Sequence, residues 1–150
     1  MNTIEIIASG DKWIGDGVIP TMSAISELID NSEDSLIMTV YVLTSDLIFD
    51  KIHLALKRGV EIEIFIYYNE DYLHLINKLK ELSESYNYCK IHILDEEFIH
   101  SKIIISDRSK LLIGSANFSH RALFSNYELG VFIDDSHIAF ELEKVIKRLL

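Results

Sequence analysis

The sequence is short of the residues that mark several special classes of protein. It contains one cysteine, Cys89, so it has no disulfide framework of its own, which excludes the disulfide-stabilised secreted domains. One proline and six glycines leave no low-complexity or linker-like segment. No apolar run approaches the roughly 18 residues that a membrane span needs. Residues 1–5 lack the basic and apolar regions of a signal peptide, so we expect a cytoplasmic protein without a membrane partner.

Positive charge is also scarce. The formal net charge is −10, which is not typical of a protein that binds nucleic acid non-specifically through a basic face. The charge is unevenly distributed, however. Residues 100–121 hold four cationic side chains and one acidic side chain, a local net charge of +3: Lys102, Arg108, Lys110, Arg121 and Asp107. A basic segment in an acidic chain indicates an anion-binding site.

The remaining composition is that of an ordinary globular domain. The 150 residues are 49% hydrophobic and 25% charged, enough apolar surface to offset the entropy of ordering the chain. No composition shift or internal repeat divides the sequence, so we expect one domain over residues 1–150.

Hydrophobic periodicity predicts alternating strands and helices. The expected strands cover 3–8, 36–43, 60–67, 89–94, 98–106, 111–116 and 126–133. The expected helices cover 20–30, 45–59, 69–86 and 134–150, with starts and ends marked by Pro20, Ser45, Gly59 and Asp135. Strand–helix alternation followed by a late hairpin predicts an α/β fold, a mixed sheet flanked by helices on both faces.

The late hairpin carries the most informative side chains. Side chains of a strand alternate between faces, so His100 and Lys102 share one face. A tight turn with Asp107 opposite Lys110 would fix the register of the two strands. The facing pairs would then be Lys102 with Ser115, and His100 with Asn117.

These side chains have the chemistry needed to hold a phosphate group. Lys102 neutralises charge, Ser115 and Asn117 donate hydrogen bonds, and His100 can act as a nucleophile or proton carrier. Asp107 lies at the turn with the opposite parity, so we expect a structural role in which it accepts hydrogen bonds from turn amides.

The spacing of these residues resembles the signature of the phospholipase D superfamily. The pattern reads His100-x-Lys102-x4-Asp107, then x6-Gly114-Ser115-x-Asn117. The segment 126–130, Asn-Tyr-Glu-Leu-Gly, resembles the acidic element of that family. The resemblance implies the phospholipase D-like fold and cleavage of phosphodiesters through a phosphohistidine intermediate, with no metal and no cofactor.

The resemblance also implies a role for each residue of the motif. One histidine attacks phosphorus, and a second protonates the leaving oxygen and then activates water; His100 is the candidate for both roles. Lys102 and Asn117 would bind non-bridging oxygens. Ser115 would bind the phosphate or order its neighbours, and Glu128 would accept a hydrogen bond from a histidine within the chain or between subunits.

A complete site in this superfamily needs two copies of the motif, and this sequence holds one. The chain thus resembles the small bacterial nuclease branch, in which two identical subunits form one site across a two-fold axis. A symmetric dimer brings each motif to the same axis, so we expect a homodimer.

Several further residues are weaker candidates. His120 and Arg121 follow the motif and could contact substrate phosphates or lie exposed. Gly130 shares the parity of Glu128, and its missing side chain could leave room at the site. Trp13 could stack on a base, although packing in a core or interface is the more common role of a tryptophan in an early loop.

Three functions are compatible with these observations. The first is a nuclease acting on DNA or RNA, controlled by a regulatory or defence-system partner because it would share a compartment with nucleic acid. The second is a lipid phosphodiesterase or phosphatidyltransferase of the same superfamily. The third is a non-catalytic module that binds nucleic acid or a protein partner. The intact motif favours the first over the third, and the lack of a basic amphipathic helix disfavours the second.

Overall fold

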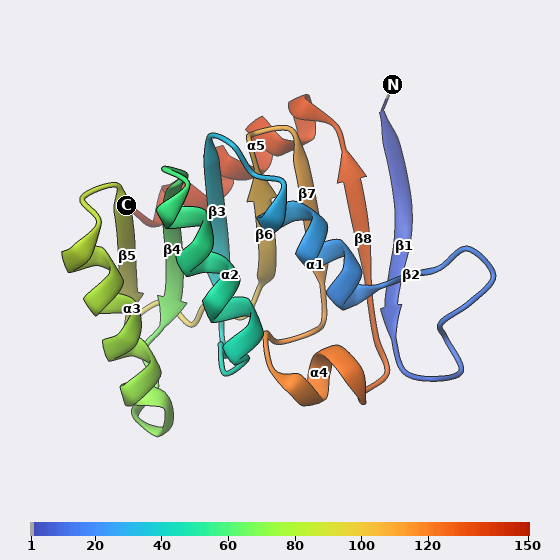
Figure 1. Ribbon diagram of the computed structural model, residues 1–150, viewed down its shortest axis with the longest axis horizontal. Coiled ribbons are helices and arrows are strands. Elements are labelled where there is room, and N and C mark those ends of the chain that lie inside the picture. The colour runs from blue at the N-terminus through green and yellow to red at the C-terminus, as the bar shows by residue number, and fades with distance from the viewer. Residues whose placement is uncertain (1) are drawn as a thin grey trace.

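A single eight-stranded sheet organises the computed structural model, which describes residues 2–150 (Figure 1). The strands are β1 (Thr3–Ser9), β2 (Ile19–Pro20), β3 (Ser35–Val40), β4 (Glu61–Tyr67), β5 (Cys89–Leu94), β6 (Lys102–Ser106), β7 (Lys110–Gly114) and β8 (Glu128–Asp134). Their order across the sheet is β2-β1-β8-β7-β6-β3-β4-β5. The β3, β4 and β5 strands are parallel to one another. The antiparallel pairs are β1–β8, β8–β7, β7–β6 and β6–β3. The predicted mixed sheet is confirmed.

Helices cover both faces of this sheet, as the sequence predicts. In Figure 1, the helices before α5 lie in front of the strands and α5 lies behind them. The helices are α1 (Thr21–Asp30), α2 (Asp46–Lys57), α3 (Leu73–Ser85), α4 (His120–Phe124) and α5 (Ser136–Ile146), with short 3-10 turns at Glu70–Tyr72 and Lys147–Leu149. No helix within residues 2–150 combines the length and apolar character needed to cross a membrane.

The helix ends follow local capping rules that the sequence already contains. The Ser45 side chain accepts a hydrogen bond from the backbone N–H of Ile48 and begins α2. Asp135 caps α5 in the same way through the N–H groups of His137 and Ile138. Gly59, with φ of +91°, follows α2 in the left-handed conformation that glycine adopts without strain.

The sheet separates two hydrophobic cores. The larger core lies under α1, α2, α3 and α4 and includes Ile25, Met38 and Ile104. The smaller core lies under α5 and includes Phe65 and Ile103. Because β3 is central and buried along its whole length, it contributes side chains to both cores.

Some element boundaries differ from the expected ones. The strand expected over 98–106 begins at Lys102, so residues 95–101 form a connection rather than a strand. The short helix α4 and the two-residue strand β2 were not predicted from periodicity. Both are shorter than the windows over which a hydrophobic period is detectable.

The predicted register of the β6–β7 hairpin is wrong by one residue. Lys102 pairs with Gly114 instead of facing Ser115. The expected pairing of His100 with Asn117 is also wrong, because both residues lie beyond the ends of the paired strands. The site residues therefore do not converge as cross-strand neighbours.

The cause is a three-residue connection where a two-residue turn was expected. Ser106 pairs with Lys110, which leaves residues 107–109 as the loop. Asp107 and Arg108 both have φ of +52°, a left-handed conformation that non-glycine residues rarely adopt. Neither residue type signals this turn as asparagine–glycine would, so the sequence pattern gave the shorter loop.

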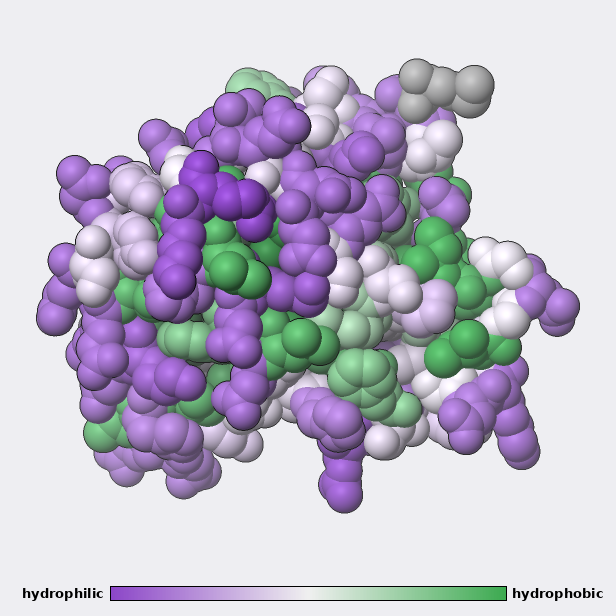
Figure 2. Space-filling model, in the orientation of Figure 1, coloured by the Kyte–Doolittle hydropathy of each residue, from purple (hydrophilic) through white to green (hydrophobic). Residues whose placement is uncertain are grey.

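One part of the sheet has no helix over it. On the α5 side, apolar side chains of β1, β7 and β8 reach solvent, among them Ile6 at 53% and Leu129 at 50% exposure. Ile113 and Val131 line the same surface. We call the surface formed by Ile6, Ile113, Leu129 and Val131 the bare sheet face. On the opposite, helix-covered side, Figure 2 shows hydrophobic residues gathered toward the loop between β1 and β2, where Ile14 is exposed.

Candidate active site

The motif residues gather where several strands begin or end at one edge of the sheet. β3 runs antiparallel to β6, so the end of β3 lies beside the start of β6 at Lys102. Gly114 ends β7 and pairs with both Lys102 and Gly130, which places Ser115 and the start of β8 at the same edge. This arrangement brings residues 100–102, 115–117 and 128 together although they are spread over 29 positions of the chain.

His100 and Lys102 form a contact pair at this edge. Lys102 Nζ lies 3.0 Å from His100 Nδ1. Lys102 is 6% exposed whereas His100 is exposed, so the imidazole faces solvent in front of a buried ammonium group. Burial lowers the pKa of Lys102 below its usual value, and the nearby Glu128 carboxylate opposes that shift. A cation held beneath an open imidazole suits a site that receives an anionic group.

Ser115 orients the carboxylate of Glu128. The Ser115 hydroxyl donates a hydrogen bond of 2.7 Å to Glu128 Oε2. The same hydroxyl oxygen accepts a hydrogen bond of 3.1 Å from the Leu129 backbone N–H. Within residues 2–150, Glu128 makes no hydrogen bond to His100, so the histidine–glutamate pair implied by the resemblance is not formed inside the chain.

Asn117 is held in place by a backbone anchor beside it. Phe118 is fully buried, and its carbonyl oxygen accepts hydrogen bonds from the N–H groups of Thr44 and Ser45 at 2.9 and 3.0 Å. Asn117 Oδ1 is buried without a hydrogen-bond partner in the described part of the chain. Buried amides are normally paired, and an unpaired one at the same end of the sheet as Lys102 fits a group that binds a ligand.

Asp107 has a structural position away from this cluster. Its carboxylate accepts hydrogen bonds from the backbone N–H groups of Glu33, Asp34 and Ser35, at 2.8 to 3.2 Å. Two of these amides belong to the α1–β3 connection and the third to the first residue of β3, whereas the sequence predicts bonds to amides of the turn at Asp107. Asp107 therefore fastens the β6–β7 hairpin to the start of β3.

Gly114 and Gly130 allow two strands to approach each other closely. A Cβ on Gly130 would lie 2.6 Å from the Ile113 carbonyl oxygen and 2.8 Å from the Gly114 Cα. The space next to Gly130 is thus filled by β7 and does not leave room for substrate, so that expectation is wrong.

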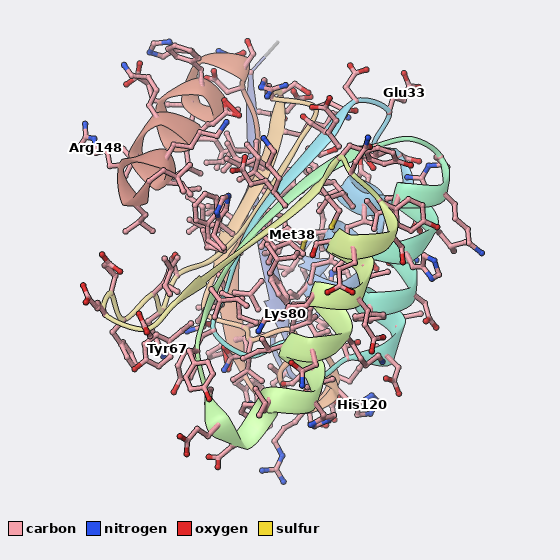
Figure 3. The ribbon with its side chains drawn as sticks, turned by 90° about the vertical axis from the view of Figure 1, so that its left-hand side faces the viewer. Glu33, Met38, Tyr67, Lys80, His120 and Arg148 are labelled. Atoms are coloured by element: carbon pink, nitrogen blue, oxygen red, sulfur yellow. The ribbon has the colours of Figure 1, made fainter. Side chains whose placement is uncertain are left out.

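His120 and Arg121 lie on α4 and are exposed. The His120 ring packs against Phe124 with centroids 4.8 Å apart. Figure 3 shows His120 on the other side of the sheet from Tyr67. Among the described residues, neither side chain hydrogen-bonds to the motif cluster, so the structure does not bring these two candidates to His100. Trp13 packs edge-on against Tyr127, with centroids 5.0 Å apart.

An aromatic group beside His100 was not predicted from the sequence. The Tyr41 ring lies 4.9 Å from the His100 ring, and the Phe98 ring lies nearly parallel to His100 at 5.8 Å. The Tyr67 ring completes the group, with its centroid 6.1 Å from that of Tyr41 and 4.7 Å from that of Phe98. One signal was present in the sequence, because Phe98 precedes His100 by two residues. Tyr41 directly follows β3 and Tyr67 ends β4, and the strand order brings both here.

Comparison with known proteins identifies the family to which this site belongs. The family model described as the cardiolipin synthase, PLD-like domain matches residues 25–150. The chain belongs to the phospholipase D-like superfamily. The resemblance of the motif is thereby confirmed, and this phospholipase D-like chain carries a phosphodiesterase-type domain.

Individual relatives show the extent of the similarity. Cardiolipin synthase A of Buchnera aphidicola subsp. Acyrthosiphon pisum is 30% identical over 136 residues, which cover 89% of this chain and 28% of that protein. Nuc from Salmonella typhimurium, a phospholipase D family member, superposes with a TM-score of 0.80 at 22% identity, covering 99% of this chain and 93% of that one. NucT from Helicobacter pylori has a TM-score of 0.70 at 20% identity, with 99% and 94% covered. The chain spans less than a third of the length of the cardiolipin synthase.

Proposed function

We propose that this phospholipase D-like chain is a metal-independent nuclease whose active site is completed by a second copy of the chain. The observation that carries the proposal is one solvent-facing His100 with Lys102, Asn117 and the Ser115–Glu128 pair at a single edge of the sheet. This set supplies one nucleophile and the groups that bind a phosphate. It supplies one of the two histidines that the reaction needs.

The reaction proceeds in two displacements at phosphorus. A ring nitrogen of His100 attacks, a phosphorus–nitrogen bond forms, and the bond to the leaving oxygen breaks as the partner's His100 donates a proton to that oxygen. The partner's His100 then takes a proton from water, whose oxygen attacks phosphorus and releases the His100 imidazole. Lys102 and Asn117 stabilise the charge on the non-bridging oxygens in both displacements.

The bare sheet face is the surface that the second copy would cover. Its apolar residues continue directly to the site, because Ser115 lines the same hollow as Ile6 and Leu129. A symmetric pairing over this face would bring both copies of His100 to one axis. Exposed apolar area of this kind on a soluble domain marks an interaction surface. The similarity to Nuc and NucT covers more than nine-tenths of each of those chains. It supports the proposal that one domain of this size is a whole subunit.

Glu128 pairs with the partner's His100 in this arrangement. Its carboxylate is held by Ser115 and is not bonded to His100 of the same chain. A carboxylate bonded to the imidazole fixes the tautomer and stabilises the protonated form that the general acid requires.

A lipid substrate is the second candidate, and the similarity to a cardiolipin synthase favours it. The surroundings of the site favour nucleic acid instead, because the Tyr41 and Phe98 rings beside His100 are a surface on which bases can stack. The exposed Asp95, Glu96 and Glu97 directly before the site oppose an anionic membrane surface and a nucleic-acid backbone alike.

A cleavage assay in EDTA separates these candidates. Wild type and His100→Ala are compared on bis(p-nitrophenyl) phosphate, single- and double-stranded DNA, RNA and phospholipid vesicles. We expect EDTA-resistant cleavage of a nucleic acid, and a loss of at least 10³-fold in the variant because the nucleophile is gone. Activity that disappears in EDTA and returns with Mg²⁺ would contradict the mechanism, and turnover of vesicle lipid alone would assign the lipid function.

A further inference from the structure

Four rings beside the motif form a continuous aromatic surface, which we call the aromatic platform: Tyr41, Tyr67, Phe98 and the imidazole of His100. Each ring of the platform lies within about 6 Å of another, and Phe98 and His100 are stacked with an interplanar angle of 10°. Figure 3 shows Tyr67 at the end of its strand, next to the β5–β6 connection. The platform therefore includes the nucleophile itself and extends from it toward β4.

The exposure of Phe98 sets this group apart from an ordinary core. Phe98 is 60% exposed although its ring is held between Tyr67 and His100. Leaving most of a phenylalanine in water forfeits much of the free energy that its burial would contribute. The tyrosines are half-buried beneath it and fix its position. A fixed and exposed aromatic face next to a phosphate-binding site has the properties of a surface on which another ring stacks.

Acidic residues adjoin the platform along the chain. Asp95, Glu96 and Glu97 precede Phe98 directly and are exposed. Glu70 and Asp71, also exposed, follow the strand that ends at Tyr67. A phosphate backbone is repelled along this border, whereas an uncharged base on the platform is not.

We propose that the aromatic platform stacks unpaired bases next to the phosphate bound at His100, so that the substrate is single-stranded nucleic acid rather than duplex. The proposal rests on the proposed function for the position of the phosphate. Aromatic stacking binds bases of any sequence and requires their faces to be free, and in a duplex those faces are covered by neighbouring base pairs. The acidic border disfavours the second strand, whose backbone would have to pass it.

Binding of labelled oligonucleotides tests the platform apart from the chemistry. The probes are a thymidine oligonucleotide, the same strand with abasic residues, and the strand annealed to its complement, all with cleavage-resistant phosphorothioate linkages. Each is measured by fluorescence anisotropy with the wild-type chain. We expect the base-containing strand to bind at least about 10-fold more tightly than the abasic strand, as expected for one stacked base. The duplex is expected to bind more weakly than the single strand.

Variants of Phe98 make the test specific. Phe98→Ala is expected to weaken binding of the base-containing strand by about 10-fold or more and that of the abasic strand by less than about twofold. Phe98→Trp should restore the preference, whereas Phe98→Leu, which keeps apolar volume without an aromatic face, should not. The control is Phe140→Ala, because Phe140 is 53% exposed on α5 and lies outside the platform.

The outcomes distinguish the platform from the nuclease proposal. A Phe98-dependent preference for bases in a chain that cleaves no nucleic acid would support the platform and overturn the proposed function. The platform would be overturned if wild type cleaves nucleic acid but Phe98→Ala binds the base-containing strand and the abasic strand as tightly as wild type does. The same holds if Phe98→Ala changes vesicle binding or the dimer dissociation constant while base preference is unchanged, since Phe98 would then face a membrane or the second copy.

Discussion

Lys102 is a charged residue in a place where most charged residues are not tolerated. Its side chain is almost fully buried, and burial lowers its pKa relative to the unfolded chain. Burying a charge carries a larger free-energy penalty than burying an apolar side chain of similar length. A buried cation that is retained despite this penalty indicates a functional role. Under the proposed function, a bound phosphate would be the partner for this charge.

Replacing Lys102 should therefore separate activity from stability. Lys102→Met is expected to reduce cleavage by about 10² to 10³-fold, as the loss of one charge-stabilising group does, with a melting temperature equal to or above that of wild type. The stability of wild type should rise as pH increases toward the usual lysine pKa, because the unfolded chain holds the proton to higher pH than the folded chain. That rise should be smaller in the variant.

Thermal unfolding between pH 7 and 10 measures this effect. The control is Lys90→Met, which changes an exposed lysine on β5 and should leave both activity and the pH dependence unaltered. A strongly destabilised Lys102→Met protein would show that the ammonium group has a structural role instead.

At the scale of elements, the hairpin of β6 and β7 has to be held against β3 for the site to form. Asp107 does this by accepting hydrogen bonds from three consecutive backbone amides, two in the α1–β3 connection and one at the first residue of β3. The Asp107 N–H in turn donates to the Ser35 carbonyl oxygen at 2.8 Å. The residue thus holds in place the hairpin whose first strand carries Lys102.

Removal of this carboxylate should reduce the free energy of unfolding. Asp107→Ala is expected to lower it by about 2–3 kcal/mol, because three amides lose a charged acceptor. Urea denaturation measures the change. Arg108→Ala is the control, since it alters the same loop at a residue whose side chain is half exposed where it pairs with Glu143, and it should cost less than about 1 kcal/mol. Equal effects of the two substitutions would contradict the anchoring role.

At the scale of the whole molecule, the bare sheet face is the feature that the single chain leaves unexplained. The α5 helix covers one part of this side of the sheet and leaves β1 and β8 open. Apolar side chains there lower the solubility of a monomer. A second copy would cover these residues and also complete the site.

Charges placed on the bare sheet face should abolish both dimer formation and activity. Ile6→Asp and Leu129→Asp are each expected to raise the dimer dissociation constant by at least about 100-fold, since a buried unpaired carboxylate opposes association. Sedimentation velocity measures the assembly, and the EDTA cleavage assay measures the activity. The control is Val145→Asp, which alters an exposed apolar residue of α5. A wild-type monomer that cleaves at full rate would contradict the shared site.

Much of the fold could be predicted because its signals are local. Ser45 and Asp135 cap the helices that their positions predict, and the alternation of apolar and polar residues gives the strands of the sheet. The hairpin register could not be predicted in the same way, since it depends on left-handed conformations at Asp107 and Arg108, which both residue types adopt only when surrounding contacts hold them.

The sequence by itself determined the chemistry of this protein: the identity and spacing of His100 and Lys102, the superfamily that they imply, and the alternating elements that carry them. The tertiary structure decided which other groups surround them. Tyr41 reaches His100 and Tyr67 reaches Tyr41 because β3 and β4 are neighbours in the sheet, and Glu128 meets Ser115 because β8 pairs with β7. Capping and periodicity act between residues a few positions apart, whereas the order and register of strands result from packing of the whole chain, and no short segment contains that information.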